Sequence, residues 1–430
     1  MNASGESTFE AKGNRGSIYG PVLILAFVSN LFEMIGISLL FRYSDFIEQI
    51  GGTEWHLGWV VGSASVGAIL FRIVQGKAVD SLGPELIWIL SILGQLLAIA
   101  WHLTIEDVNG MEIYLARFLF AASVAGNFGA WLSFTSFQAP KERIAEVIGV
   151  VGSSGFLGMA IGPTLGDILF SENGWNWDPV KAMLVASFIS ISIGLVIASM
   201  ACWLGRNKRL QNRTHPNSKN QPGQNGSTKE GAFTAIRRFH PGFLLFVGVM
   251  MGVTIGFPSN FLRPWTKSLL IEEIKVFFIV YNVVAFSSRI MFRRAPQSLG
   301  LERTILLALG FMIASFLLYL VVEQVGGMLW LPAIAAGLAH SFLFPSVITA
   351  CSNAFPNRHR GLAMNMILGM YDLGVLLGMP AIGFIVTESP ALGWKAYPTT
   401  FLAIAVLIGV VALAFARLGI RNRNDEEDLT

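Results

Sequence analysis

Five ionisable side chains lie inside long apolar stretches of the sequence. Four are charged, Glu33, Arg117, Asp167 and Asp372, and the fifth is His340. Ionisable groups are costly to place in such surroundings, so those that occur there are candidates for a proton relay or for contacts with a polar ligand. A carboxylate paired with an arginine stays ionised, whereas a carboxyl group separated from it in an apolar cavity takes up a proton. These residue types are suited to moving protons or holding a polar solute.

Long apolar helices must position these residues. Of the 430 residues, 53% are hydrophobic and only 13% are charged, whereas a soluble domain carries about 25% charged residues. This composition excludes a soluble enzyme, a nucleic-acid-binding protein and a disordered scaffold. A helix that crosses a bilayer needs about 20 mostly apolar residues. Twelve such runs are present: Tyr19–Leu40, His56–Val74, Leu86–Leu103, Ile113–Phe137, Ile144–Phe170, Val180–Leu204, Gly242–Leu262, Ile274–Met291, Thr304–Val322, Met328–Ala350, Gly361–Val386 and Thr399–Leu418.

One long polar segment divides the twelve runs into six and six. We expect an N-terminal tail (1–18), a six-helix bundle (19–204), a basic linker (205–241), a second six-helix bundle (242–418) and a C-terminal tail (419–430). Of the 30 Lys and Arg residues, 23 fall on the linker's side of the membrane, with Arg72 and Arg289 counted among its connections. The positive-inside rule therefore predicts a cytoplasmic linker and cytoplasmic termini. Short outer loops are typical of a protein of the bacterial cytoplasmic membrane.

The two halves of the sequence repeat one another. The segment Arg72–Glu85 matches Arg289–Glu302, at an offset close to half the length of the chain. A second echo links the fifth and eleventh runs through Gly158, Gly162, Pro163 and Gly166 in one and Gly374, Gly378, Pro380 and Gly383 in the other. Parallel repeats of six helices are one way in which membrane transporters are built, with the substrate site at the interface of the two halves.

A short pattern follows the second run, with Gly76, Asp80 and Gly83 in the order Gly-x-x-x-Asp-x-x-Gly. The glycines permit a tight turn, and the carboxylate can cap neighbouring helix ends. In this pattern and in its repeat, the sequence resembles the major facilitator superfamily, and Arg117 resembles the arginine that opens the family's span-four signature. The resemblance implies an all-α membrane protein with 12 transmembrane helices in two pseudo-symmetric six-helix bundles. It also implies a secondary transporter that works by rocking alternating access, with spans one and four lining the cavity.

The fifth run carries a glycine pattern similar to the family's antiporter signature, formed by Gly149, Gly158, Gly162, Pro163 and Gly166. In the family this pattern is associated with export. Glycines four residues apart also make a flat helix face that lets a second helix approach closely, so a packing role is the alternative.

The five ionisable residues predict two pairs. Glu33 and Arg117 belong to spans one and four and fall in the outer third of the membrane, so we expect a switchable pair in which Glu33 exchanges a proton. A fixed structural ion pair that includes Asp167 is the alternative. His340 and Asp372 fall near the middle of spans ten and eleven and could relay protons or grip a polar substrate. A hydrogen bond that only packs helices is the alternative for His340.

Further polar residues are weaker candidates for the cavity lining, because each could instead form hydrogen bonds between helices. They are Asn30, Asn127, Asn260, Tyr281 and Asn282.

The sequence lacks the GxxxxGK[ST] pattern, the HExxH pattern and paired Cys/His spacings. We therefore expect no enzyme, no cofactor and no metal site, and an ion gradient as the driving force. The expected partners are a small-molecule substrate, protons and the lipid bilayer, with no nucleic acid, and the chain is expected to be a monomer. Proton-driven export of a small organic solute or drug is the first prediction. Proton-coupled uptake of a sugar, organic acid or amino acid is the alternative, and a receptor without net flux is a third reading.

Overall fold

The structure is a computed structural model that describes residues 20–139, 143–171, 177–213, 232–292, 295–356 and 359–420. Within these ranges every regular element is a helix, so the prediction of an all-α fold is confirmed. The two predicted tails and the middle of the predicted linker lie almost entirely outside the described residues.

The N-terminal half contains six long helices. They are α1 (Pro21–Leu39), α3 (Glu54–Leu82), α4 (Pro84–His102), α5 (Met111–Gln138), α6 (Ile144–Leu169) and α7 (Pro179–Arg213). The first continues through the 3-10 turn η1 (Leu40–Arg42) into the short helix α2 (Tyr43–Gln49). The second predicted run ends at Val74, but α3 continues to Leu82, so Arg72 lies within the helix and not in a connection.

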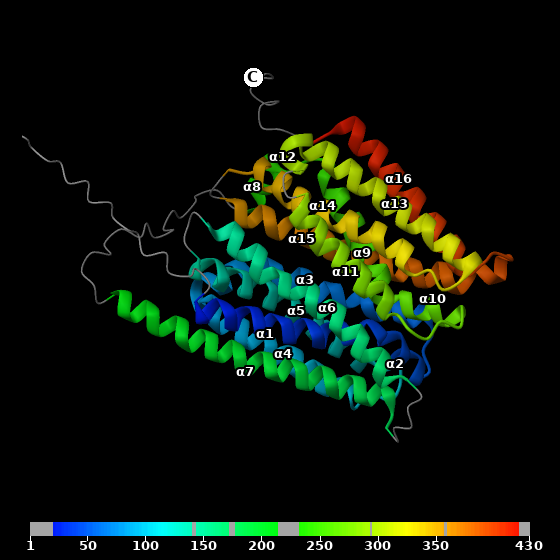
Figure 1. The fold of residues 1–430 in the computed structure, drawn as a ribbon, viewed down its shortest axis with the longest axis horizontal. Coiled ribbons are helices and arrows are strands. Elements are labelled where there is room, and N and C mark those ends of the chain that lie inside the picture. Colours follow the sequence, from blue (N-terminus) through cyan, green and yellow to red (C-terminus); the bar gives the residue numbers. More distant parts are fainter. Residues whose placement is uncertain are drawn as a thin grey trace, which may run out of the picture.

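The C-terminal half repeats this arrangement. Its long helices are α9 (Leu244–Asn260), α11 (Lys275–Met291), α13 (Leu301–Val325), α14 (Trp330–Ala354), α15 (Arg360–Glu388) and α16 (Ala396–Leu418). Shorter helices are α8 (Ala232–Phe239), α10 (Leu262–Ser268), α12 (Ala295–Leu299) and the 3-10 turn η4 (Ser389–Leu392). The two halves lie side by side, with α7 along one edge of the molecule and α16 along the opposite edge (Figure 1).

In the part of the chain that the structure describes, ten helices are long and apolar enough to cross a membrane, or eleven if a bent pair counts as one span. The bent pair is α9 and α10, which meet at 50°. Pro258 lies in the last turn of α9, and proline in a helix breaks the hydrogen-bond ladder and bends the rod. The eighth predicted span corresponds to α11, which has 17 residues. Twelve spans are therefore consistent with the fold.

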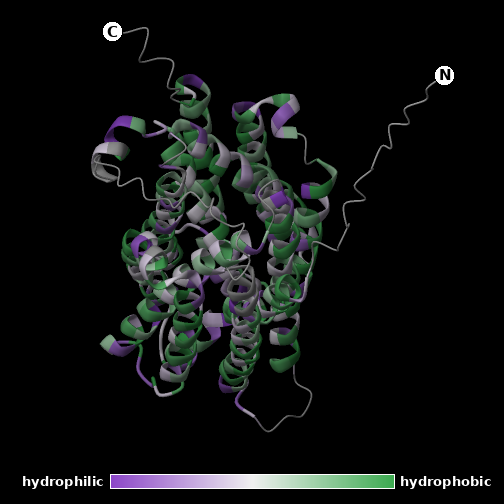
Figure 2. Cartoon of the chain, turned by 90° about the vertical axis from the view of Figure 1, so that its left-hand side faces the viewer, coloured by the Kyte–Doolittle hydropathy of each residue, from purple (hydrophilic) through white to green (hydrophobic). Residues whose placement is uncertain are grey.

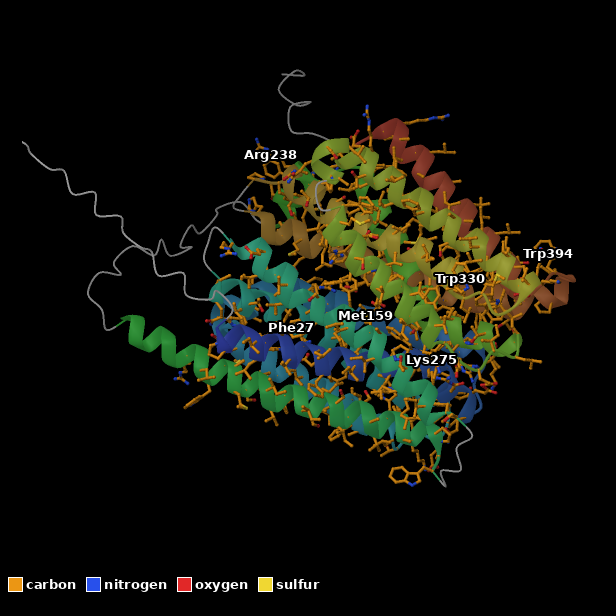
Figure 3. All side chains as sticks on the ribbon, viewed as in Figure 1. Phe27, Met159, Arg238, Lys275, Trp330 and Trp394 are labelled. Atoms are coloured by element: carbon orange, nitrogen blue, oxygen red, sulfur yellow. The ribbon has the colours of Figure 1, made fainter. Side chains whose placement is uncertain are left out.

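The molecule has two ends, which are distinguished by the elements that lie there. Apolar residues predominate on the helices, with hydrophilic residues in scattered patches (Figure 2). We call one end the linker end, because α7 ends and α8 begins there. We call the other the distal end, where α2 and α10 lie (Figure 1). Arg238 lies at the linker end, and Lys275 and Trp394 lie at the distal end (Figure 3).

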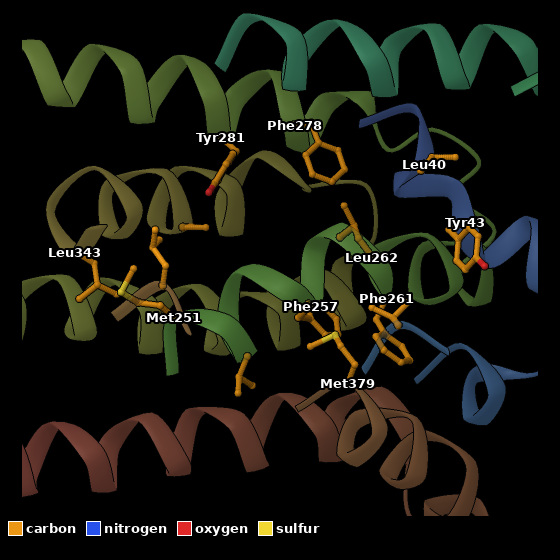
Figure 4. Close-up of a cluster of buried hydrophobic side chains, with 14 of the residues drawn as sticks. Leu40, Tyr43, Met251, Phe257, Phe261, Leu262, Phe278, Tyr281, Leu343 and Met379 are labelled. Carbon is orange, nitrogen blue, oxygen red and sulfur yellow. The ribbon is translucent and has the colours of Figure 1, made fainter. Parts of the chain in front are cut away.

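Aromatic packing consolidates the C-terminal half towards the distal end. Phe257, Trp265, Tyr319 and Phe401 are fully buried, and the ring centroids of the pairs in contact lie 5.0–5.5 Å apart. This cluster holds α9 and α10 against α13 and α16, and Phe257 and Phe261 form part of the apolar cluster in Figure 4. Rings at these separations in tilted and edge-to-face arrangements add stability beyond the area that they bury.

Candidate functional site

Arg42 binds both halves of the molecule at the distal end. Its side chain is 2% exposed, and Nη2 lies 2.7 Å from Oδ1 of Asp167 on α6. The same nitrogen donates to the main-chain oxygen of Glu272 in the C-terminal half, also at 2.7 Å. Nη1 donates to Asp45 at 3.2 Å. Because a guanidinium presents several donors in a fixed fork, one arginine joins three segments.

Arg263, in the C-terminal half, likewise binds a residue of the other half. Its Nε lies 3.3 Å from Oδ2 of Asp45, and its Nη2 lies 2.7 Å from Oε2 of Glu272. The hydrogen bond from Arg263 holds the pKa of Glu272 below its ordinary value. Lys267 adds an exposed ion pair with Glu48 at 2.6 Å. Together these contacts close the distal end by linking α10 and the loop that follows it to η1 and α2.

Asp167 belongs to this distal network. Arg42 is its cation, and the main-chain nitrogen of Lys275 donates to its second oxygen at 2.8 Å. The predicted alternative, a fixed ion pair of Glu33 and Arg117 that includes Asp167, is not formed in this conformation, because Asp167 binds Arg42 instead. This partner, Arg42, lies just beyond the end of the first predicted run.

Glu33 is fully buried within the N-terminal half. Ser29 donates to its Oε1 at 3.1 Å, and the indole nitrogen of Trp88 donates to the same oxygen at 3.3 Å. Asn127 on α5 is buried and lies near this carboxyl group. Among the described residues Oε2 has no hydrogen-bond partner, and no cation pairs with the carboxyl group. A buried charge without a counter-ion is costly, so this position suits a group that exchanges a proton.

Arg117 lies apart from Glu33 in this conformation. Its guanidinium stacks on the rings of Tyr43 at 4.2 Å and Phe120 at 5.0 Å, and the described residues give Nη1 no hydrogen-bond partner. Tyr43 follows η1, near the distal end, whereas Glu33 precedes the end of α1 by six residues, or about 9 Å along the helix. The structure therefore does not bring the predicted pair together, and a switchable contact stays a prediction.

His340 and Asp372 do not form the predicted pair. His340 on α14 contacts the hydroxyl of Tyr281 on α11. Asp372 on α15 instead binds Arg72 on α3 of the other half, with 2.5 Å between Oδ2 and Nε. The side chains of Asp372 and Arg72 are 8% and 10% exposed. Asp372 therefore links the two halves, whereas His340 contacts Tyr281 within the C-terminal half.

Arg289 on α11 is a further arginine between the halves. Its guanidinium carbon lies 4.9 Å from the ring centroid of Phe156 on α6, and Nε is buried without a hydrogen-bond partner in the described part of the chain. Phe156 also lies 6.3 Å from the ring of His340. Guanidinium, imidazole, phenol and phenyl groups thus gather where α6, α11 and α14 meet.

Most of the predicted polar lining residues form hydrogen bonds within the bundles. Asn30 donates to Ser154 on α6 at 2.7 Å, which joins two helices of one half. Asn260 and Asn282 donate to main-chain oxygens one turn earlier in their own helices. Of the five candidates, Tyr281 is the one that contacts the group around Arg289.

The glycines of the antiporter-like pattern pack helices. A side chain at Gly158 would meet Met34 of α1, and one at Gly162 would meet Ser38 of the same helix. Gly374 and Gly378 face α9 in the same way. The packing alternative is thus supported at these positions, while Gly149 has open space around it. An association with export stays a prediction.

The connection after the second span begins with a turn that requires glycine. Gly83 has a φ of +85°, and Gly300, its counterpart in the repeat, has a φ of +86°. Residues other than glycine rarely adopt such values. Gly76 and Asp80 lie on α3, and the side chain of Asp80 is outside the described residues.

Four arginines that join the halves were not among the candidate site residues expected from the sequence, namely Arg42, Arg72, Arg263 and Arg289. Arg72 and Arg289 fall within the last turn of predicted spans and were counted with the connections, and they occupy the same position of the repeat. That coincidence was the available signal. For metals, no group of three or more His, Cys, Asp or Glu residues lies together within the described ranges.

The family model described as Major Facilitator Superfamily matches residues 22–322 and 272–429, and the chain belongs to this superfamily. It is therefore a multi-pass integral membrane protein and a transporter by family. That superfamily is not a family of enzymes.

Relatives and solved structures agree with this assignment. The staphylopine export protein of Staphylococcus aureus is 21% identical over 409 residues, covering 92% of this chain and 96% of that protein. The crystal structure of the nucleoside transporter NupG superposes with a TM-score of 0.68 at 14% identity, over 93% of this chain and 99% of that one. A D-xylose–proton symporter gives a TM-score of 0.69 at 15% identity, over 91% and 96%. These likenesses establish the fold.

Proposed function

We propose that the protein exports a small organic solute in exchange for protons, by alternating access between its two halves. The observation that carries the proposal is Glu33, a fully buried carboxyl group that lacks a cation among the described residues. The linker end faces the cytoplasm and the distal end faces outwards, in accordance with the positive-inside rule. The chain resides in a bacterial cytoplasmic membrane.

Export is supported by the name of one relative, the staphylopine export protein, which is similar along almost its whole length. Proton coupling is supported by the name of a structural neighbour, the D-xylose–proton symporter. That second likeness also favours the alternative function, proton-coupled uptake. The direction of transport therefore has to be measured.

Alternating access requires one end to close while the other opens. The distal contacts of Arg42 and Arg263 join the halves in this conformation. Release of the solute to the outside requires these contacts to separate. Protonation of Glu33 accompanies one of the two states, and hydrogen bonds from Ser29 and Trp88 hold the carboxyl group in place.

The test is solute-driven proton movement in liposomes that contain the purified protein and a pH-sensitive dye. Pooled organic solutes and cationic dyes are added under an imposed proton gradient. We expect solute to move against the proton flow, and we expect Glu33→Gln to abolish the coupling because the amide cannot ionise. Glu112→Gln is the matched control, since Glu112 is an exposed acid at the start of α5.

Three outcomes separate the possible functions. Coupled movement that persists in Glu33→Gln would remove this residue from the proton pathway. Movement of solute and protons in the same direction would establish uptake. Saturable binding of solute without flux would favour a receptor.

A further inference from the structure

The repeat places equivalent arginines on equivalent helices. Arg72 on α3 and Arg289 on α11 are the first residues of the two matched segments, so they align with one another in the sequence. Each of these helices packs against a helix of the other half, α3 against α15 and α11 against α6. The two contacts therefore correspond to one another across the pseudo-symmetry axis.

The glycines of α6 and α15 show how these two helices align with one another in the repeat. Gly158 and Gly162 align with Gly374 and Gly378, at almost the same offset as the first echo. Each pair packs against the first long helix of its own half, α1 or α9. In this register Phe156 corresponds to Asp372.

Each arginine contacts the equivalent position of the other half, but the residue that it meets differs. Arg72 meets Asp372, and the two form an ion pair. Arg289 meets Phe156, and its guanidinium lies over the phenyl ring. The C-terminal half therefore places a positive charge between the halves without the carboxylate that balances its counterpart.

The groups around Arg289 are chemically suited to contact an anion. Its buried Nε has no acceptor among the described residues, and unpaired buried donors are rare and costly. Tyr281 and His340 contact one another nearby and offer further hydrogen-bonding groups. Phe156 and Phe344 flank His340 and provide apolar surface.

We propose that Arg289 binds a carboxylate of the transported solute, which occupies the place that Asp372 fills for Arg72. Phe156 packs against the apolar body of the solute, and Tyr281 and His340 bind its polar groups. A guanidinium matches a planar carboxylate with two parallel hydrogen bonds. This assignment of substrate class rests on the proposed function. Because Phe156 and Arg289 belong to different halves, movement of the halves brings these two residues together or separates them.

Thermal unfolding of the purified protein in detergent tests the ligand class. The probes are benzoate, lactate and glutamate, and the comparison compounds are phenyl phosphate, benzenesulfonate and benzylamine. We expect at least one carboxylate to raise the midpoint saturably. Arg289→Gln should raise the half-saturating concentration by about tenfold or more, because it removes a charge-assisted pair.

Changes at Phe156 sharpen the test. Phe156→Asp restores the carboxylate that the repeat lacks, so it should pair with Arg289 and exclude the ligand as strongly as Arg289→Gln does. Phe156→Asn removes the ring without adding a charge, so it should weaken binding less. If Phe156→Asp fails to fold, Arg289→Lys replaces it and should give intermediate binding, because lysine keeps the charge but loses the fork. Arg143→Gln, at an exposed ion pair, is the unaffected control.

Several results would overturn the proposal. Stronger stabilisation by phenyl phosphate, benzenesulfonate or benzylamine than by every carboxylate would assign another ligand class. So would unchanged carboxylate binding in Arg289→Gln, or no stabilisation by any of the compounds. Solute-driven proton movement by a cationic dye, unaffected by Arg289→Gln, would overturn the carboxylate site but keep the transporter. Saturable carboxylate binding without flux of any solute would overturn the transporter but keep the site.

Discussion

The contact of α3 with α15 and the contact of α11 with α6 occupy equivalent places in the two halves, yet they differ in charge. Arg72 is neutralised by Asp372, whereas Arg289 rests on the ring of Phe156. A buried pair resists separation because each partner would be left as an isolated charge. An unmatched guanidinium, in contrast, is available to a ligand. The asymmetry therefore assigns a structural role to one contact and a binding role to the other.

The arginines of the distal end also differ from Arg289. There, Arg42 and Arg263 are both buried, and each is bound to carboxylates. The arginines that join the halves at that end are thus satisfied in the closed arrangement, while the described residues give Arg289 no carboxylate. Closure of the distal end and an unmatched charge at Arg289 are features of the same conformation.

The largest effect is expected at the α3–α15 contact. Asp372→Asn leaves Arg72 buried without a counter-ion, so the free energy of unfolding should fall by about 3–5 kcal/mol. Thermal unfolding in detergent measures the loss. The double variant Arg72→Gln with Asp372→Asn removes both charges and should recover most of it. Equal losses in the single and double variants would show that the charge pair is not the cause.

An intermediate effect is expected at the distal end. Arg42→Gln removes the donors to Asp167 and to the main chain of Glu272, which should weaken closure by about 2 kcal/mol or more. Spin labels at Glu106 and Leu270, on a background without Cys202 and Cys351, report the separation of the two halves by pulsed electron resonance. We expect a longer distance than in the parent protein. An unchanged distance would mean that other contacts hold the distal end closed.

The smallest effect is expected at the exposed pair. The Lys267 and Glu48 side chains are 44% and 60% exposed, and such pairs contribute about 0–1 kcal/mol. Lys267→Gln should therefore leave the spin-label distance close to that of the parent protein. A change as large as that of Arg42→Gln would contradict the ranking of buried over exposed contacts.

The spans and the repeat could be predicted from the sequence because hydropathy and glycine spacing are local properties. Helix ends were harder, since α3 continues past its apolar stretch to Leu82 and places Arg72 inside the bundle. The contact partners of the ionisable residues were harder still to predict. Depth estimates placed Glu33 near Arg117, and His340 near Asp372, but depth does not determine which helix face a residue occupies.

The repeat contained more information than the hydropathy did. Arg72 and Arg289 align in the sequence, and both were assigned to connections because they fall within the last turn of a predicted span. Their partners Asp372 and Phe156 belong to the opposite halves of the chain, and only the packing of α15 and α6 brings them there. Contacts between the halves depend on tertiary structure, which a pattern of residue types does not specify.

The most direct test of the difference between the two contacts is thermal unfolding of Arg72→Gln and Arg289→Gln, side by side and without added solute. Arg72→Gln leaves Asp372 buried and unpaired, so its midpoint should fall clearly below that of the parent protein. Arg289→Gln removes a charge that has no counter-ion among the described residues, so its midpoint should stay the same or rise. Equal destabilisation by the two substitutions would contradict the division between a structural and a ligand-binding arginine.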